Sequence, residues 1–153
     1  MTVPNLPPTV PSTTVLPAPT LLLLAQQGLD DAAGSGAPGQ RYALAHLAAL
    51  RGAAAVLACR ARPAGGPTGP ARPSRPTSAW VLLTAVAPEL GEWAAFFAAG
   101  ARKRAAAEAG LTGAVTPREA DDLLRDATSF LDVVQQALGV QGPPGRAADA
   151  RAS

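Results

Sequence analysis

The segment from residue 116 to residue 139 limits the fold more than any other part of this chain, because it combines a helix start, an apolar stripe and a helix stop. Thr116 and Glu119 form the Thr-x-x-Glu pattern of a capping box, and Pro117 suits the first helical position. Gly139 is a stop signal. Apolar residues recur at three- and four-residue steps, at Ala120, Leu123, Leu124, Ala127, Phe130, Leu131, Val134 and Leu138. The segment is therefore predicted to be an amphipathic helix with that side buried.

Four further helices are predicted before this one. Glycine or proline separates them, and they cover approximately residues 20–33, 38–61, 78–87 and 88–109. In the second, alternating steps of four and three predict a buried stripe of Ala43, Leu47, Leu50, Ala54 and Leu57. No segment has the alternation of a strand, so the fold class is predicted to be all-α, a four- to five-helix bundle.

Three segments are predicted to lack regular structure, because they are rich in proline, glycine or polar residues and have no apolar periodicity. They are a disordered Pro-rich tail at 1–17, a flexible basic loop at 61–77 and a disordered tail at 140–153. The helical bundle is expected to span residues 18–139. A length of 153 residues fits one domain with tails.

Cysteine content and hydropathy indicate the compartment. Cys59 is the only cysteine, so no intramolecular disulfide can form and the sequence contains no Cys/His metal motif. The apolar run at 21–24 is short and follows no Lys or Arg, unlike a signal peptide. No run approaches the roughly 20 apolar residues of a membrane span. The protein is expected to be cytoplasmic, without a metal, another cofactor or a membrane partner.

The net charge of +2 is unevenly distributed. The middle of the chain is basic, which is compatible with contacts to phosphate or nucleic acid. The last predicted helix is acidic, which is compatible with a basic partner or a second copy of the chain. The alternative is that both are solvated faces. The residues predicted to bind nucleic acid are Arg60, Arg62, Arg72, Arg75, Arg102, Lys103 and Arg104.

Arg41 and the only histidine, His46, have the spacing Arg-x4-His. An imidazole can move the proton of a 2′-hydroxyl and a guanidinium can stabilise a charged phosphate, so the pair is a candidate metal-independent ribonuclease site. Residues five apart on a helix point about 140° away from each other, and relative to the predicted stripe of this helix Arg41 points away while His46 lies at the flank. The alternative is therefore that His46 is a boundary residue that forms a hydrogen bond within the bundle.

The aromatic residues and the acids of the last helix are expected to be structural. Trp80, Trp93, Phe96, Phe97 and Phe130 lie on or beside apolar stripes and are expected in the core. Asp121 is expected to pair with Arg125 at the i,i+4 spacing.

The phrases APELGEWAAFFAAGA and READDLLRDA, together with the order of the predicted helices around a basic loop, resemble a family of small HEPN-type proteins from high-GC bacteria. The likeness covers about residues 21–138. It implies a bundle of four or five helices that is often dimeric. It also implies a superfamily that includes metal-independent ribonucleases, toxins of toxin–antitoxin pairs, and inactive relatives that bind RNA or nucleotides.

Ribonucleases of this superfamily carry Arg-x4–6-His, usually in a late helix and with a polar residue after the arginine. Here Tyr42 follows Arg41, and the last predicted helix has no histidine. The predicted function is therefore a non-catalytic module that binds RNA, a nucleotide or a protein partner, with a homodimer as a further candidate assembly. The alternatives are a metal-independent endoribonuclease that uses Arg41 and His46, and a structural or adaptor bundle.

Overall fold

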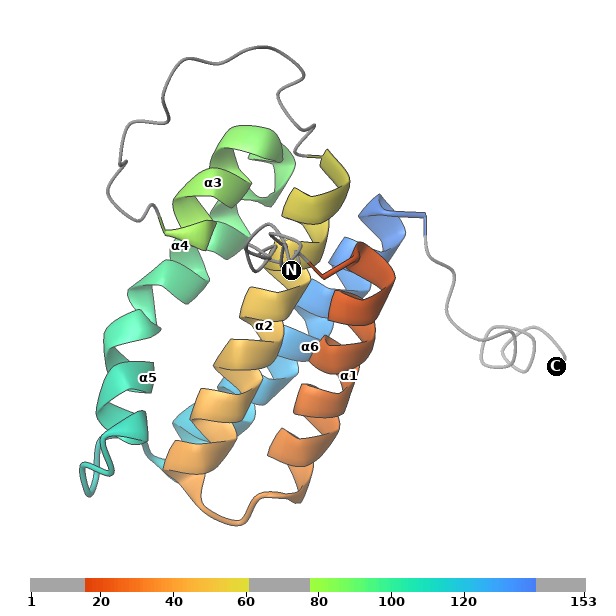
Figure 1. Cartoon of the computed structure of the whole chain (residues 1–153). Coiled ribbons are helices and arrows are strands. Elements are labelled where there is room, and N and C mark those ends of the chain that lie inside the picture. Colours follow the sequence, from red (N-terminus) through yellow and green to blue (C-terminus); the bar gives the residue numbers. More distant parts are fainter. Residues whose placement is uncertain (1–15, 61–77, 140–153) are drawn as a thin grey trace, which may run out of the picture.

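The computed structural model describes residues 16–60 and 78–139, and every regular element in these two ranges is helical (Figure 1). The elements are α1 (Ala18–Gly34), α2 (Pro38–Arg60), α3 (Ala79–Val86), the 3-10 turn η1 (Pro88–Leu90), α4 (Gly91–Ala99), α5 (Ala101–Glu108) and α6 (Pro117–Ala137). The predicted all-α bundle is confirmed. The predicted loop at 61–77, the tail at 140–153 and nearly all of the tail at 1–17 lie outside the described residues.

The helix α2 is the centre of the bundle, since it packs against α1, α3, α5 and α6. In Figure 1, α1, α2 and α6 run alongside one another, while α4 and α5 follow each other on the far side of α2 from α1. The short helix α3 packs against both α2 and α4 near one end of the bundle. The core therefore lies around α2, with α4 and α5 at its edge.

The predicted buried stripe of α2 was wrong, because the helix buries its small residues instead. The buried positions are Tyr42, Ala45, His46, Ala48, Ala49, Gly52, Ala53, Ala55 and Val56, whereas the predicted Ala43, Leu47, Leu50, Ala54 and Leu57 are only partly buried. A central helix has neighbours on several sides, and small side chains let their backbones approach. A Cβ atom on Gly52 would lie 3.2 Å from Cδ1 of Leu131 on α6.

By length and hydropathy alone, α2 is long and apolar enough to cross a membrane, contrary to the sequence expectation. Its most apolar 18-residue window has a mean hydropathy of 1.5, and half of that window is buried inside the bundle. Core helices of globular proteins have the same properties, because they are apolar around most of their circumference.

The helix α6 begins with the predicted capping box. The Thr116 hydroxyl accepts a hydrogen bond from the Glu119 amide at 3.1 Å, and Oε2 of Glu119 accepts one from the Thr116 amide at 2.8 Å. Six of the predicted stripe positions are buried, namely Ala120, Leu123, Ala127, Phe130, Leu131 and Val134. The prediction for this helix is therefore confirmed at its start and on its buried side.

An aromatic cluster fills the space between α3, α4 and α6. The ring centroid of Phe97 lies 5.2 Å from that of Trp80 and 5.1 Å from that of Phe130. All three side chains are buried, as predicted. Phe96 is 45% exposed, so its core prediction was wrong, whereas Trp93 is partly buried and packs against the core. Because α4 lies at the edge of the bundle, it buries only a narrow side.

The predicted single helix at 88–109 is interrupted. It consists of η1, α4 and α5, and α4 ends at Gly100, whose amide donates to the Phe97 carbonyl at 3.1 Å. A Cβ atom on Gly100 would lie only 2.7 Å from the hydroxyl oxygen of Tyr42 on α2. The interruption therefore lies where Tyr42 of α2 reaches this backbone, and a larger residue at position 100 would force the Tyr42 side chain to shift.

Candidate functional site

His46 lies inside the bundle, against the junction of α4 and α5. Its side chain is 1% exposed, and Nε2 lies 2.8 Å from the Phe97 carbonyl oxygen. Because a carbonyl only accepts hydrogen bonds, Nε2 carries the proton and donates it. The same carbonyl accepts from the Gly100 amide. His46 therefore joins α2 to the backbone between α4 and α5. The expected hydrogen bond within the bundle is present, but the expected place at the boundary was wrong, because α2 has neighbours on several sides and buries this residue.

Burial lowers the pKa of His46 below its ordinary value of 6.5. The hydrogen bond to Phe97 opposes this effect, while the positive charge of Arg104 adds to it. The imidazole is consequently neutral at pH 7. Nδ1 of His46 and Nε of Arg104 are buried with no hydrogen-bond partner among the described residues.

Tyr42 extends this polar region by one helical turn, and sequence reasoning had not assigned it a role. Its ring stacks on that of His46 with a centroid distance of 6.5 Å, and its hydroxyl donates to the Gly100 carbonyl at 3.5 Å. The pKa of Tyr42 is raised, mainly because the side chain is buried. The positive charge of Lys103 opposes this effect, and the negative charge of Glu119 adds to it. The signal in the sequence is the four-residue spacing of Tyr42 and His46 on one side of a helix.

Arg41 makes contacts on a different side of α2. Its guanidinium donates to the Ser35 carbonyl through Nε at 3.1 Å and Nη2 at 2.7 Å, and it forms an ion pair with Asp121. Arg41 thus joins the α1–α2 turn to α6, while His46 faces α4 and α5. The structure does not bring these two candidate catalytic side chains together.

The expected ion pair between Asp121 and Arg125 was wrong. Asp121 pairs with Arg41, and Arg125 donates instead to Asp122 at 3.0 Å. Local spacing cannot reveal a partner 80 residues away in the chain, such as Arg41.

Four of the seven residues predicted to bind nucleic acid lie within the described residues. Arg102 is exposed and has no ion pair in these ranges. Three others form ion pairs with acidic side chains of this chain. The pairs are Arg60 with Glu89, Lys103 with Glu119, and Arg104 with Glu108. The remaining three, Arg62, Arg72 and Arg75, lie outside the described residues. Where they are described, most of these cations therefore have their charge offset by a neighbouring carboxylate.

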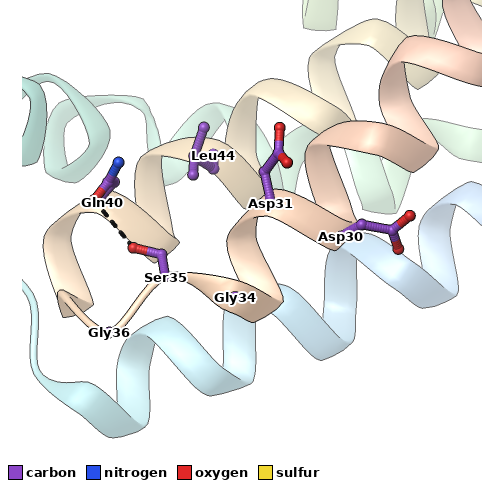
Figure 2. Close-up of a pocket in the computed structure, with 7 residues that line it drawn as sticks. All are labelled: Asp30, Asp31, Gly34, Ser35, Gly36, Gln40 and Leu44. Carbon is purple, nitrogen blue, oxygen red and sulfur yellow. Dashed lines mark hydrogen bonds between the residues drawn. The ribbon is translucent and has the colours of Figure 1, made fainter.

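One groove lies beside the turn between α1 and α2 (Figure 2). It is lined by Asp30, Asp31, Gly34, Ser35, Gly36, Gln40 and Leu44. The Ser35 hydroxyl donates to Oε1 of Gln40 at 3.1 Å. In Figure 2 the two aspartate side chains point in different directions and away from this hydrogen bond. In a ligand site, polar groups converge on one point, but the polar groups of this groove do not.

A second groove, of about 330 Å³, lies between α4 and α6. Glu92, Trp93 and Phe96 line it from α4, and Asp126 lines it from α6. Sequence reasoning missed this combination, because the pairing of α4 with Asp126 exists only in the folded chain. No group of three or more His, Cys, Asp or Glu side chains in the described ranges is placed to hold a metal ion.

Three large apolar side chains are exposed on α3 and α4, two helices that pack against each other. Val81 is 60% exposed, Leu82 is 44% exposed and Phe96 is 45% exposed. These three residues are called the α3–α4 surface below. Exposed apolar side chains that form one contiguous patch are typical of binding sites for other molecules. The groove between α4 and α6 shares Phe96 with this surface.

The model of one protein family, described as SAV_6107-like HEPN, matches residues 32–135. The match covers more than half of the chain and includes all of α2, α3, α4 and α5. No curated protein and no solved structure matches the sequence.

Proposed function

The chain belongs to the SAV_6107-like HEPN family, and from this premise we propose that it is a non-catalytic member that binds a protein partner through the α3–α4 surface. The observation that carries the non-catalytic part is the burial of His46, whose side chain is 1% exposed. A general base must come within hydrogen-bond reach of the proton that it removes. An enclosed imidazole whose proton is held by the Phe97 carbonyl is poorly placed to reach a 2′-hydroxyl.

A protein partner is favoured over RNA by the distribution of charge and apolar area. Binding to nucleic acid depends on cations that neutralise phosphates. Among the described candidates, Arg60, Lys103 and Arg104 face carboxylates of the same chain. The exposed side chains of the α3–α4 surface are instead aliphatic and aromatic, and aromatic residues are enriched in protein interfaces.

We expect purified protein not to cleave RNA in EDTA. The reason is that His46 and Arg41 each hold backbone or side-chain groups of the bundle and face different neighbours. The measurement is the integrity of a labelled RNA on a denaturing gel. Cleavage that disappears in both His46→Ala and Arg41→Ala, with each variant folded by circular dichroism, would establish the ribonuclease alternative instead.

The α3–α4 surface can be tested by affinity capture from cells that express the protein. The double substitution Val81→Ser and Leu82→Ser should weaken the affinity for the captured protein by about tenfold or more, which corresponds to the loss of about 1.4 kcal/mol, and so lower its yield. Both side chains are exposed, so the variant should remain folded. Leu23→Ser on α1, at a side chain that is 59% exposed, is the matched control. Equal losses in the control, or loss on nuclease treatment, would refute the proposal.

His46 also makes the stability of the fold depend on pH. Its pKa is lower in the folded chain than in the unfolded chain, so the unfolded chain binds the proton first as the pH falls. We expect the stabilising effect of a neutral His46 to be complete above pH 6.5 and to be lost as the pH falls through the lower folded pKa. His46→Gln keeps a donor for the Phe97 carbonyl and does not titrate. In urea unfolding between about pH 7.5 and 5, wild type should lose more stability than this variant, and equal losses would contradict the prediction.

A further inference from the structure

The groove between α4 and α6 has aromatic walls that are held in place from behind. The Trp93 ring lies nearly parallel to that of Phe97, with centroids 6.2 Å apart and an angle of 16° between the planes. Its centroid is 5.6 Å from that of Phe130. Phe97 and Phe130 are fully buried, so they fix Trp93 at the edge of the core. Phe96, which is 45% exposed, completes the apolar lining.

The two acids of the groove differ from the acids at the start of α6. Glu119, Asp121 and Asp122 each form an ion pair with a lysine or arginine of this chain. Glu92 and Asp126 form none among the described residues, although both line the same groove. Two carboxylates beside exposed aromatic rings complement a cation with a flat or apolar body.

We infer that this groove receives an arginine side chain from the protein partner. The inference rests on the proposed function, because it names the chemistry of the partner at one end of the α3–α4 surface. A guanidinium is planar and stacks on aromatic rings, and its donors fit carboxylates better than the compact ammonium of lysine does. Trp93 and Phe96 supply the rings, while Glu92 and Asp126 supply the carboxylates.

The chain contains two tryptophans, which gives the test an internal control. Trp80 is 5% exposed in the core, whereas Trp93 lines the groove. In an NMR titration with N-acetyl-arginine amide, the indole N–H signal of Trp93 should shift saturably and that of Trp80 should not. N-acetyl-citrulline amide has the same shape without the charge. It should bind at least about tenfold more weakly, as should N-acetyl-lysine amide.

The double substitution Glu92→Gln and Asp126→Asn should weaken arginine binding by about tenfold or more and remove its dependence on salt. Asp132→Asn, which changes an exposed acid of the same helix outside the groove, should leave both unchanged. An unmoved Trp93 signal, an unchanged response of the double variant, or equal binding of the lysine or citrulline probe would overturn the inference.

Failure of the inference is distinguishable from failure of the proposed function. If capture of a partner is lost in Val81→Ser/Leu82→Ser but not in Glu92→Gln/Asp126→Asn, the protein-binding surface stands and the arginine site is overturned. If sedimentation shows that wild type self-associates through this groove and the double variant does not, the occupant is a second copy, which also overturns the inference as stated.

Discussion

Replacement of Phe97 by alanine is expected to lower the free energy of unfolding by about 3–5 kcal/mol. The side chain is 0% exposed, and its ring contacts Trp80 of α3 and Phe130 of α6 as well as the neighbouring Trp93. Removal of the ring opens a cavity where three helices meet. Since a small domain is typically stable by only about 5–15 kcal/mol, the variant should be close to unfolding.

Phe96 provides the matched control for Phe97. It is the same residue type on the same helix, but its side chain is 45% exposed. Phe96→Ala should therefore cost less than about 1 kcal/mol. Urea unfolding followed by circular dichroism measures both variants. Similar losses for the two would mean that α4 packs with a different side toward the core.

Replacement of Leu131 by alanine is the second large effect, with an expected cost of about 2–5 kcal/mol. Leu131 is 2% exposed and lies where α6 packs against α2, next to Gly52. Asp132 is exposed one residue later, so Asp132→Ala should change stability by no more than about 0.5 kcal/mol.

This pair of variants tests which side of α6 is buried. Both substitutions leave the same residue, alanine, so differences in helix propensity at these positions are small compared with the expected loss of packing. Equal destabilisation of Leu131→Ala and Asp132→Ala would contradict the packing of α6 against α2.

The parts of the fold that could be predicted are those whose causes are local in the chain. The capping box of α6 involves Thr116 and Glu119, three residues apart, and the apolar stripe repeats within one helix. The buried side of α2 could not be predicted in the same way. Periodicity identifies a single apolar side, whereas α2 contacts four other helices and buries small residues that scarcely contribute to an apolar stripe.

The interruption at Gly100 and the partners of the candidate site residues depend on distant parts of the chain. A Cβ atom on Gly100 would displace the hydroxyl of Tyr42, which is 58 residues away in the chain. Arg41 forms an ion pair with Asp121, which is 80 residues away in the chain. The hydrogen bond of His46 was foreseen from its angle to Arg41 on a helix, but its acceptor on Phe97 was not.

The groove between α4 and α6 could not be predicted from the sequence, because the sequence does not show which aromatic side chains are exposed. From sequence, the five aromatic residues lie on or beside apolar stripes and were all assigned to the core. Only packing separates Phe96 and Trp93, at the edge, from Phe97 in the interior. Asp126 joins them from α6 because the chain returns past α4.

The central claim, that this protein binds a protein partner through the α3–α4 surface, is tested most directly by photo-crosslinking in cells. A benzophenone amino acid placed at Leu82 should give a discrete crosslink to another protein, insensitive to nuclease, whereas the same probe at the more exposed Leu23 on α1 should give none. Crosslinks to RNA from position 82, or the same protein crosslinked from both positions, would contradict the claim.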